Sequence, residues 1–93
     1  MAKLNVDMRG QFDADIREIV VEHGRLQLDA CALGRDADLY AAGMTSHASV
    51  GVMLALEQRF GVEFPEHLLT PSVFSSVAAI SRALDELVIR RAG

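Results

Sequence analysis

The sequence contains no tryptophan, one tyrosine and only 5% aromatic residues, so aliphatic side chains must supply its core. Alanine, valine, leucine and isoleucine make up most of the 51% of hydrophobic residues, which favours packed helices over a β-sandwich. No apolar run approaches the roughly 20 residues that a membrane-spanning helix needs. Residues 1–7 also lack the hydrophobic stretch of a signal peptide. We therefore expect a cytoplasmic protein with no membrane partner.

Cysteine and basic residues are scarce as well. The single cysteine, Cys31, has no partner for an internal disulfide, and we expect it to be a small buried apolar side chain. Three dispersed histidines, His23, His47 and His67, do not form a metal-binding pattern. The nine basic residues are outnumbered by 13 acidic ones, for a net charge of −4. A chain of that charge repels phosphate backbones, so we expect no nucleic-acid partner.

The length and composition predict one folded domain. Residues 1–11 are expected to be a flexible N-terminal lead-in, and residues 12–93 the domain itself. With 93 residues and 24% charged side chains, the chain can bury a modest core but has no room for a separate catalytic cleft.

Apolar spacing predicts three helices of appreciable length. The first begins at Asp13 and ends at Gly24, the second covers residues 46–60 and stops at Gly61, and the third follows Ser72 as its N-cap. Their expected buried positions are Phe12, Ile16, Ile19 and Val20 in the first, Val52, Met53 and Leu56 in the second, and Val73, Val77, Ile80, Leu84, Leu87 and Val88 in the third. His23 falls on the same side of the first helix by spacing and is expected to be a surface or boundary residue, as is His67. The acidic residues of the first helix (Asp13, Asp15, Glu18 and Glu22) are expected to form a solvated face.

The connection over residues 25–45 has no sustained periodicity. It carries scattered apolar residues, namely Leu26, Leu28, Leu33, Leu39 and Tyr40, which predict a loop packed across the bundle. Residues 66–69 are expected to form one short helical turn between Pro65 and Pro71. The predicted fold is all-α: a small four-helix bundle with three main helices, one short helix and a long loop between the first two.

Ser46 is the candidate functional residue. It lies at the first turn of the helix over residues 46–60, where free backbone N–H groups and the helix dipole favour an attached anion such as a phosphodiester. A plain helix N-cap is the alternative role for such a serine. The neighbouring His47 would point about 100° away, and no carboxylate orients its ring, so we expect no catalytic pair.

The order of motifs around Ser46 resembles the acyl and peptidyl carrier protein family from about Ile16 to Leu87. The matching segments are Asp38-Leu39-Tyr40-Ala41-Ala42-Gly43, Gly43-Met44-Thr45-Ser46 and Leu56-Glu57-Gln58-Arg59-Phe60-Gly61-Val62-Glu63-Phe64-Pro65. The resemblance implies that a phosphopantetheinyl transferase esterifies Ser46 with 4′-phosphopantetheine. The terminal thiol of that arm then holds a cargo as a thioester. It implies a carrier with no catalytic residues, and spacing favours Ser46 over Thr45, which is expected to be an N-cap or a contact for the modifying enzyme.

The sequence departs from the usual family pattern beside the serine. Members usually have aspartate before it, leucine after it and a row of acids along the helix, whereas this chain has Thr45 and His47, and only Glu57 is acidic on that face. Gly51 inside the helix costs about 1 kcal/mol relative to alanine, which suggests a close approach by a partner. The expected partner contacts are Thr45, His47, Ala48, Val50, Gly51 and Leu54. We expect docking by small-residue fit and apolar contact, with weak salt dependence.

These departures resemble a subset of the family, the carriers charged by amino acid:carrier protein ligases related to class II seryl-tRNA synthetases. The shared segments are Asp38 to Ser46, Phe64-Pro65-Glu66-His67-Leu68-Leu69 and Val73-Phe74-Ser75-Ser76-Val77. The resemblance implies a small amino acid such as glycine or alanine as cargo, and a downstream acyl-transfer enzyme. We expect a monomer that binds each partner transiently. A carrier of fatty acyl or polyketide intermediates is the alternative within the family, and a small helical interaction module without a prosthetic group is the alternative outside it.

Overall fold

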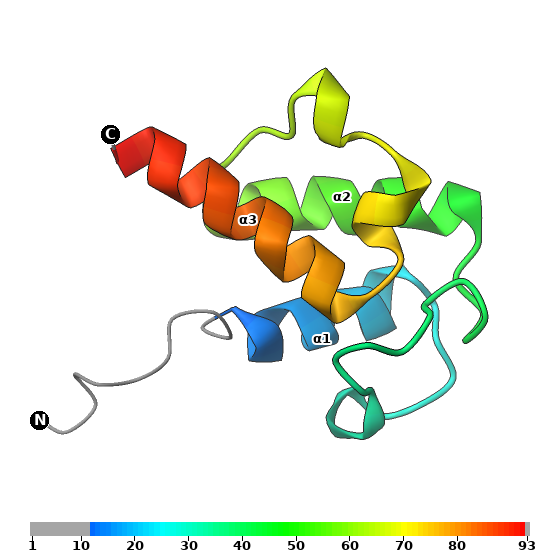
Figure 1. Cartoon of the computed structure of the whole chain (residues 1–93). Helices are drawn as coiled ribbons and strands as arrows, with labels where there is room; N and C mark the ends of the chain where they lie inside the picture. The colour runs from blue at the N-terminus through cyan, green and yellow to red at the C-terminus, as the bar shows by residue number, and fades with distance from the viewer. Residues whose placement is uncertain (1–11, 93) are drawn as a thin grey trace, which may run out of the picture.

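The computed structural model describes the backbone of residues 12–92 and the side chains of residues 12–88, so the predicted lead-in of residues 1–11 lies outside the described part. The main elements are the helices α1 (Asp13–His23), α2 (Ser46–Phe60) and α3 (Val77–Ala92). Short 3₁₀ turns are η3 (Ala30–Ala32), η4 (Glu66–Leu68) and η5 (Pro71–Phe74). Helix α1 packs against both α2 and α3 (Figure 1). The all-α fold, with three main helices and a long loop between the first two, is confirmed.

The core is aliphatic, as the composition predicts. Its largest fully buried side chains are Ile16 and Val20 from α1, Val52 and Leu56 from α2, and Val77, Ile80 and Leu84 from α3. Four residues predicted to be buried are only partly buried and pack against the edge of this core, namely Phe12, Met53, Val73 and Val88. His23 is exposed, as expected of a surface or boundary residue. No helix in the described part of the chain is long and apolar enough to cross a membrane.

The long loop between α1 and α2 is fastened to the bundle by its backbone. Arg17 Nε donates to the Leu33 carbonyl (2.8 Å), and Leu33 itself is buried. The Ala78 N–H donates to the Arg35 carbonyl (2.9 Å). These hydrogen bonds satisfy backbone groups that a packed loop would otherwise bury unpaired. The predicted packing of the loop across the bundle is thereby confirmed.

Two expectations for the first third of the chain are wrong. Cys31 is exposed because it lies on η3, a single turn that projects from the loop and buries none of its residues. Asp13 does not belong to a purely solvated face, since its side chain is only 13% exposed and pairs with Arg35 at 2.6 Å. Asp15 pairs with Arg59 of α2 at 3.0 Å, so this acid also bridges elements.

The approach to α3 differs from the prediction. Pro71 starts η5, and α3 begins only at Val77, so Ser72 is not its N-cap. Ser76 has that role, because its Oγ accepts the Ala79 N–H (3.0 Å). The preceding carbonyl, that of Ser75, accepts the Leu39 N–H of the loop (2.8 Å) and so does not start the helix.

The end of α2 explains the motif Leu56-Glu57-Gln58-Arg59-Phe60-Gly61. Gly61 has φ of +64°, a left-handed conformation that favours glycine. The Phe60 ring packs edge-on against Phe12, with 5.0 Å between the ring centroids. Glu57 Oε2 accepts the Phe64 N–H (2.9 Å) and ties the following segment back to the helix. Glu57 is therefore a structural residue, and the expectation that it supplies an acid to the exposed face of α2 is wrong.

We predict that Glu57→Ala lowers the free energy of unfolding by about 1–3 kcal/mol, because the partly buried Phe64 N–H would lose its charged acceptor. Urea unfolding measures the change. The matched control is Glu63→Ala, an exposed acid six residues later, which should change stability by no more than about 0.5 kcal/mol. Equal losses in the two variants would contradict the structural role of Glu57.

Candidate functional site

Two adjacent hydroxyls at the start of α2 have different environments. Thr45 has extended backbone geometry (φ −87°, ψ 164°), and its Oγ1 accepts the Ala48 N–H at 2.9 Å. It is the N-cap of the helix, which confirms that part of its predicted role. Ser46, the first helical residue, is exposed. Within the described residues its hydroxyl makes no hydrogen bond, so it is the hydroxyl left available for chemistry.

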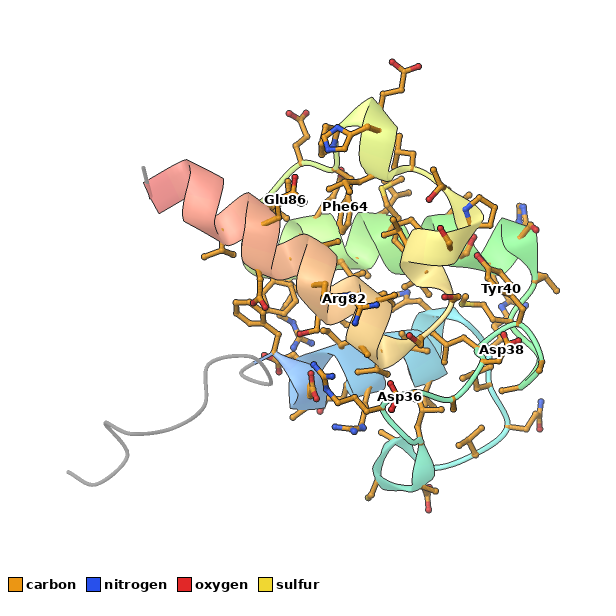
Figure 2. All side chains as sticks on the ribbon, in the orientation of Figure 1. Asp36, Asp38, Tyr40, Phe64, Arg82 and Glu86 are labelled. Carbon is orange, nitrogen blue, oxygen red and sulfur yellow. The ribbon has the colours of Figure 1, made fainter. Side chains whose placement is uncertain are left out.

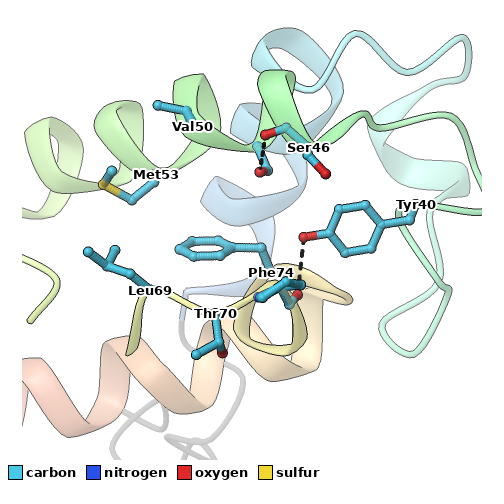
Figure 3. Close-up of a pocket in the computed structure, with 9 residues that line it drawn as sticks. Tyr40, Ser46, Val50, Met53, Leu69, Thr70 and Phe74 are labelled. Carbon is cyan, nitrogen blue, oxygen red and sulfur yellow. Dashed lines mark hydrogen bonds between the residues drawn. The ribbon is translucent and has the colours of Figure 1, made fainter. Parts of the chain in front are cut away.

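The backbone around Ser46 favours negative charge. The first backbone hydrogen bond of the helix runs from the Ser49 N–H to the Thr45 carbonyl (3.0 Å), so the N–H groups of Ser46 and His47 precede the bonded ladder. They lie at the positive end of the helix dipole. The Ser49 hydroxyl donates to the Ser46 carbonyl (2.7 Å; Figure 3) and is thereby occupied.

The segment before α2 holds this helix start in place. Asp38 Oδ1 accepts the N–H groups of Tyr40 and Ala41 at 3.0 and 3.2 Å, which closes a turn. Figure 2 labels Asp38 and Tyr40 on this segment. Gly43 has φ of +120°, a backbone conformation that L side chains rarely adopt. Met44 is 2% exposed and anchors the chain in the core two residues before Ser46. The turn at Asp38, the backbone conformation of Gly43 and the burial of Met44 together fix the placement of Ser46.

An apolar groove of about 290 Å³, here called the η5 groove, borders Ser46 on one side (Figure 3). Its lining consists of Tyr40, Ser46, Ser49, Val50, Met53, Leu69, Thr70, Pro71 and Phe74. The Tyr40 hydroxyl donates to the Pro71 carbonyl (3.1 Å), which joins the loop to η5 at this groove. Ile80 is fully buried in the core, as expected, whereas Phe74 is buried and also contributes to the groove wall.

A second groove, here called the α1–α2 groove, begins at the residues that flank Ser46. Its lining combines Glu22, His23 and Arg25 from the end of α1 with Thr45, His47, Ala48, Val50 and Gly51, around a volume of about 780 Å³. Leu54 lines the adjoining hollow together with Gly51 and His23. The structure thus brings the six predicted partner contacts onto one continuous surface. Val50 and Leu54 are 51% and 54% exposed, which is high for large apolar side chains.

The sequence prediction missed the other wall of the α1–α2 groove. Glu22 lies in the last turn of α1 and Arg25 just after it, so the periodicity of α2 contains no signal for them. The sequence does contain a signal for the end of α1, but it indicates the wrong residue. Gly24 suggests the left-handed position, yet the left-handed residue is Arg25 (φ +60°). Among the described residues, no group of three or more His, Cys, Asp or Glu side chains could hold a metal ion.

Comparison with known proteins identifies the chain. The phosphopantetheine attachment site family matches residues 14–84, and the aminoacyl carrier protein of Agrobacterium fabrum (strain C58) is 46% identical over 69 residues. That match covers 74% of this chain and 83% of the relative. The chain belongs to the aminoacyl carrier proteins of the phosphopantetheine attachment family. Its fold and its cofactor, covalently attached phosphopantetheine, follow from this membership.

Two solved structures extend the likeness of this carrier. One is an engineered Bradyrhizobium japonicum glycine:carrier protein ligase complexed with the carrier protein from Agrobacterium tumefaciens and ATP. It matches with a TM-score of 0.77 and 41% identity, over 82% of this chain and 99% of that one. The other is a Bradyrhizobium japonicum glycine:carrier protein ligase complexed with glycylated carrier protein. It matches with a TM-score of 0.62 and 28% identity, over 83% and 99% of the two chains.

The start of α2 fits the phosphopantetheine group on its own geometry. The carrier presents an exposed hydroxyl, N–H groups that favour a phosphodiester, and an apolar groove that begins at the same residue. The two nearby hydroxyls do not offer this combination, because those of Thr45, one residue earlier, and Ser49, three residues later, are already hydrogen-bonded within the helix start.

We predict that Thr45→Ala destabilises the carrier by about 0.5–2 kcal/mol through loss of the N-cap, and that Thr45→Ser restores most of this. Ser46→Ala should leave stability nearly unchanged, because the removed hydroxyl has no partner within the described chain. Thermal and urea unfolding of the three variants test this separation. A destabilised Ser46→Ala protein together with an unaffected Thr45→Ala protein would contradict it.

Proposed function

We propose that this carrier bears 4′-phosphopantetheine on Ser46 and holds a small amino acid, such as glycine or alanine, as a thioester. The observation that carries the proposal is the unpartnered, exposed Ser46 hydroxyl at the first position of α2, between two hydroxyls that are already used. When attached, the arm supplies a thiol that can hold and release an acyl group.

The residues around Ser46 have separate tasks in this proposal. The backbone N–H groups of Ser46 and His47 stabilise the charge of the phosphodiester. Val50, Met53 and Leu69 offer apolar contact to the arm, because they line the η5 groove that opens at Ser46. That groove has no carboxylate in its lining, so the ammonium group of an amino acid gains nothing by entering it. An aminoacyl cargo is therefore left in solvent, where partner enzymes can reach it.

The proposed loading enzyme is an ATP-dependent amino acid:carrier protein ligase related to class II seryl-tRNA synthetases. The support is the likeness to carriers in complex with glycine:carrier protein ligases, one of them glycylated. A phosphopantetheinyl transferase and a downstream acyl-transfer enzyme complete the expected partners. Catalytic groups then come from these enzymes, and the carrier itself is a substrate. It is proposed to act as a monomer in the cytoplasm, where coenzyme A and ATP are supplied.

A carrier of fatty acyl or polyketide intermediates is the second candidate, and the η5 groove favours it. Its apolar walls, among them Phe74 and Leu69, suit an alkyl chain better than an amino acid. Family membership excludes the third alternative, an interaction module without a prosthetic group.

Intact-mass measurement tests the attachment site. After incubation with coenzyme A and a broad-specificity phosphopantetheinyl transferase, the wild type should gain the mass of one phosphopantetheinyl group. Ser46→Ala should gain nothing, and Thr45→Ala should still be modified. An unmodified wild type, or a modified Ser46→Ala protein, would reject Ser46 as the site.

A loading assay tests the cargo. The phosphopantetheinylated carrier is incubated with ATP, single amino acids and the engineered glycine:carrier protein ligase, and hydroxylamine-sensitive mass gain reports the thioester. We expect one small amino acid per carrier. If a fatty acyl ligase loads the same preparation and no amino acid is accepted, the aminoacyl function is wrong and the second candidate holds.

A further inference from the structure

The end of α1 has an arginine at a backbone conformation that favours glycine. Helix α1 is capped by Gly24 in ordinary helical geometry, and Arg25 then adopts the left-handed conformation (φ +60°). The Leu26 N–H returns to the Val21 carbonyl at 3.1 Å, which completes a Schellman-type helix end. Glycine is the usual residue at the left-handed position because a Cβ is unfavourable there.

The neighbouring residue, Gly24, must be glycine for a packing reason. A Cβ on Gly24 would approach the Val20 carbonyl oxygen to 2.4 Å and the Met44 sulfur to 3.3 Å, so the chain is too close there for a side chain. That constraint does not extend to position 25, where Arg25 is exposed. In the described part of the chain its guanidinium has no hydrogen bond or ion pair. The backbone strain at Arg25 is therefore not compensated by any hydrogen bond or ion pair of its side chain within the described part of the chain.

Gly51 on α2 is a second residue whose type is unfavourable for the stability of its own element. A Cβ built there would lie 3.9 Å from the His23 carbonyl oxygen, an ordinary contact distance, so packing within the chain does not require glycine. A glycine inside a helix nevertheless lowers its stability. Gly51 and Arg25 line the same α1–α2 groove, whose other residues include Thr45 and His47 on either side of Ser46.

We propose that the α1–α2 groove is the docking surface for the amino acid:carrier protein ligase, with Arg25 and Gly51 as its specificity-determining residues. The ligase is expected to place an apolar side chain over Gly51, against Val50 and Leu54, and a carboxylate or helix C-terminus against Arg25. The proposal rests on the proposed aminoacyl function, because it names the ligase as the occupant. Its location follows from continuity with Ser46, since an enzyme that loads the terminal thiol must bind within reach of the attached arm.

The charges on the groove determine the chemistry of the partner. Glu57, the one acid of α2, is used by the Phe64 N–H, which leaves the exposed face of α2 without a free carboxylate. The groove carries Arg25 and the single acid Glu22, together with His23 and His47. A partner surface of mixed sign with an acidic group opposite Arg25 complements this pattern, whereas a uniformly basic surface does not.

The test compares steady-state loading of phosphopantetheinylated variants by the engineered glycine:carrier protein ligase. Arg25→Asn keeps a residue that tolerates left-handed geometry and removes the guanidinium. We expect its KM to rise about tenfold with kcat unchanged, as for loss of a charged contact outside the reacting centre. Arg25→Lys should keep part of the affinity. Gly51→Ala should raise KM as well, while its melting temperature stays equal to or above that of the wild type.

The matched control is Arg82→Asn, an exposed arginine on α3 outside the α1–α2 groove, which should leave KM unchanged. An unchanged KM in both Arg25→Asn and Gly51→Ala would overturn the docking proposal while wild-type loading still supports the aminoacyl function. If the wild type takes up phosphopantetheine but no amino acid, the aminoacyl function fails first, and the docking proposal fails with it. A lower melting temperature for Arg25→Asn would show that the arginine stabilises the fold, which contradicts the proposal.

Discussion

The hydrogen bond from the Leu39 N–H to the Ser75 carbonyl joins the two parts of the chain on which the site depends. It ties the loop before α2 to the turn before α3 at 2.8 Å, with Leu39 fully buried at the junction. Because the Ser75 carbonyl is used in this way, α3 begins two residues later and η5 remains a separate turn. Because Leu39 is fixed, Tyr40 reaches the Pro71 carbonyl, and the η5 groove has a closed wall beside Ser46.

Periodicity and local signals are enough to predict the helices and the position of Ser46 at the start of α2, since these depend on residues close together in the sequence. The N-cap of α2 follows from Thr45 and its spacing to Ala48, and the end of α2 follows from Gly61. Several of the errors involve partners outside the element that was being predicted. Glu57 serves Phe64 beyond the helix end, Asp13 pairs with Arg35 on the loop, and the start of α3 depends on Leu39. No local pattern specifies such pairings.

The two grooves beside α2 differ in how much their residues contribute to the stability of the fold. Toward η5, Val50 and Met53 border a groove that the fold shapes with its own hydrogen bonds. Toward α1, the surface has an exposed Leu54, a helix-interior Gly51 that packing does not require, and a strained Arg25. Each of these features lowers the stability of the isolated carrier or leaves it unchanged. Their concentration around one groove is expected of a surface selected for binding, because stability alone would have replaced them.

The charges of the α1–α2 groove also affect discrimination against enzymes that serve other carrier proteins. Enzymes that recognise a row of acids on the second helix present basic surfaces to it, whereas the α1–α2 groove carries one arginine, Arg25, one acid, Glu22, and no free carboxylate from α2. A basic surface therefore lacks the acidic partners it needs here, and this loss of attraction discriminates against it, because specificity is the difference between two binding energies. A bulky side chain in place of Gly51 would fill the floor of the groove and block close approach by any partner. In the proposed complex, the missing row of acids disfavours basic partners, and Gly51 leaves space for the apolar side chain of the ligase.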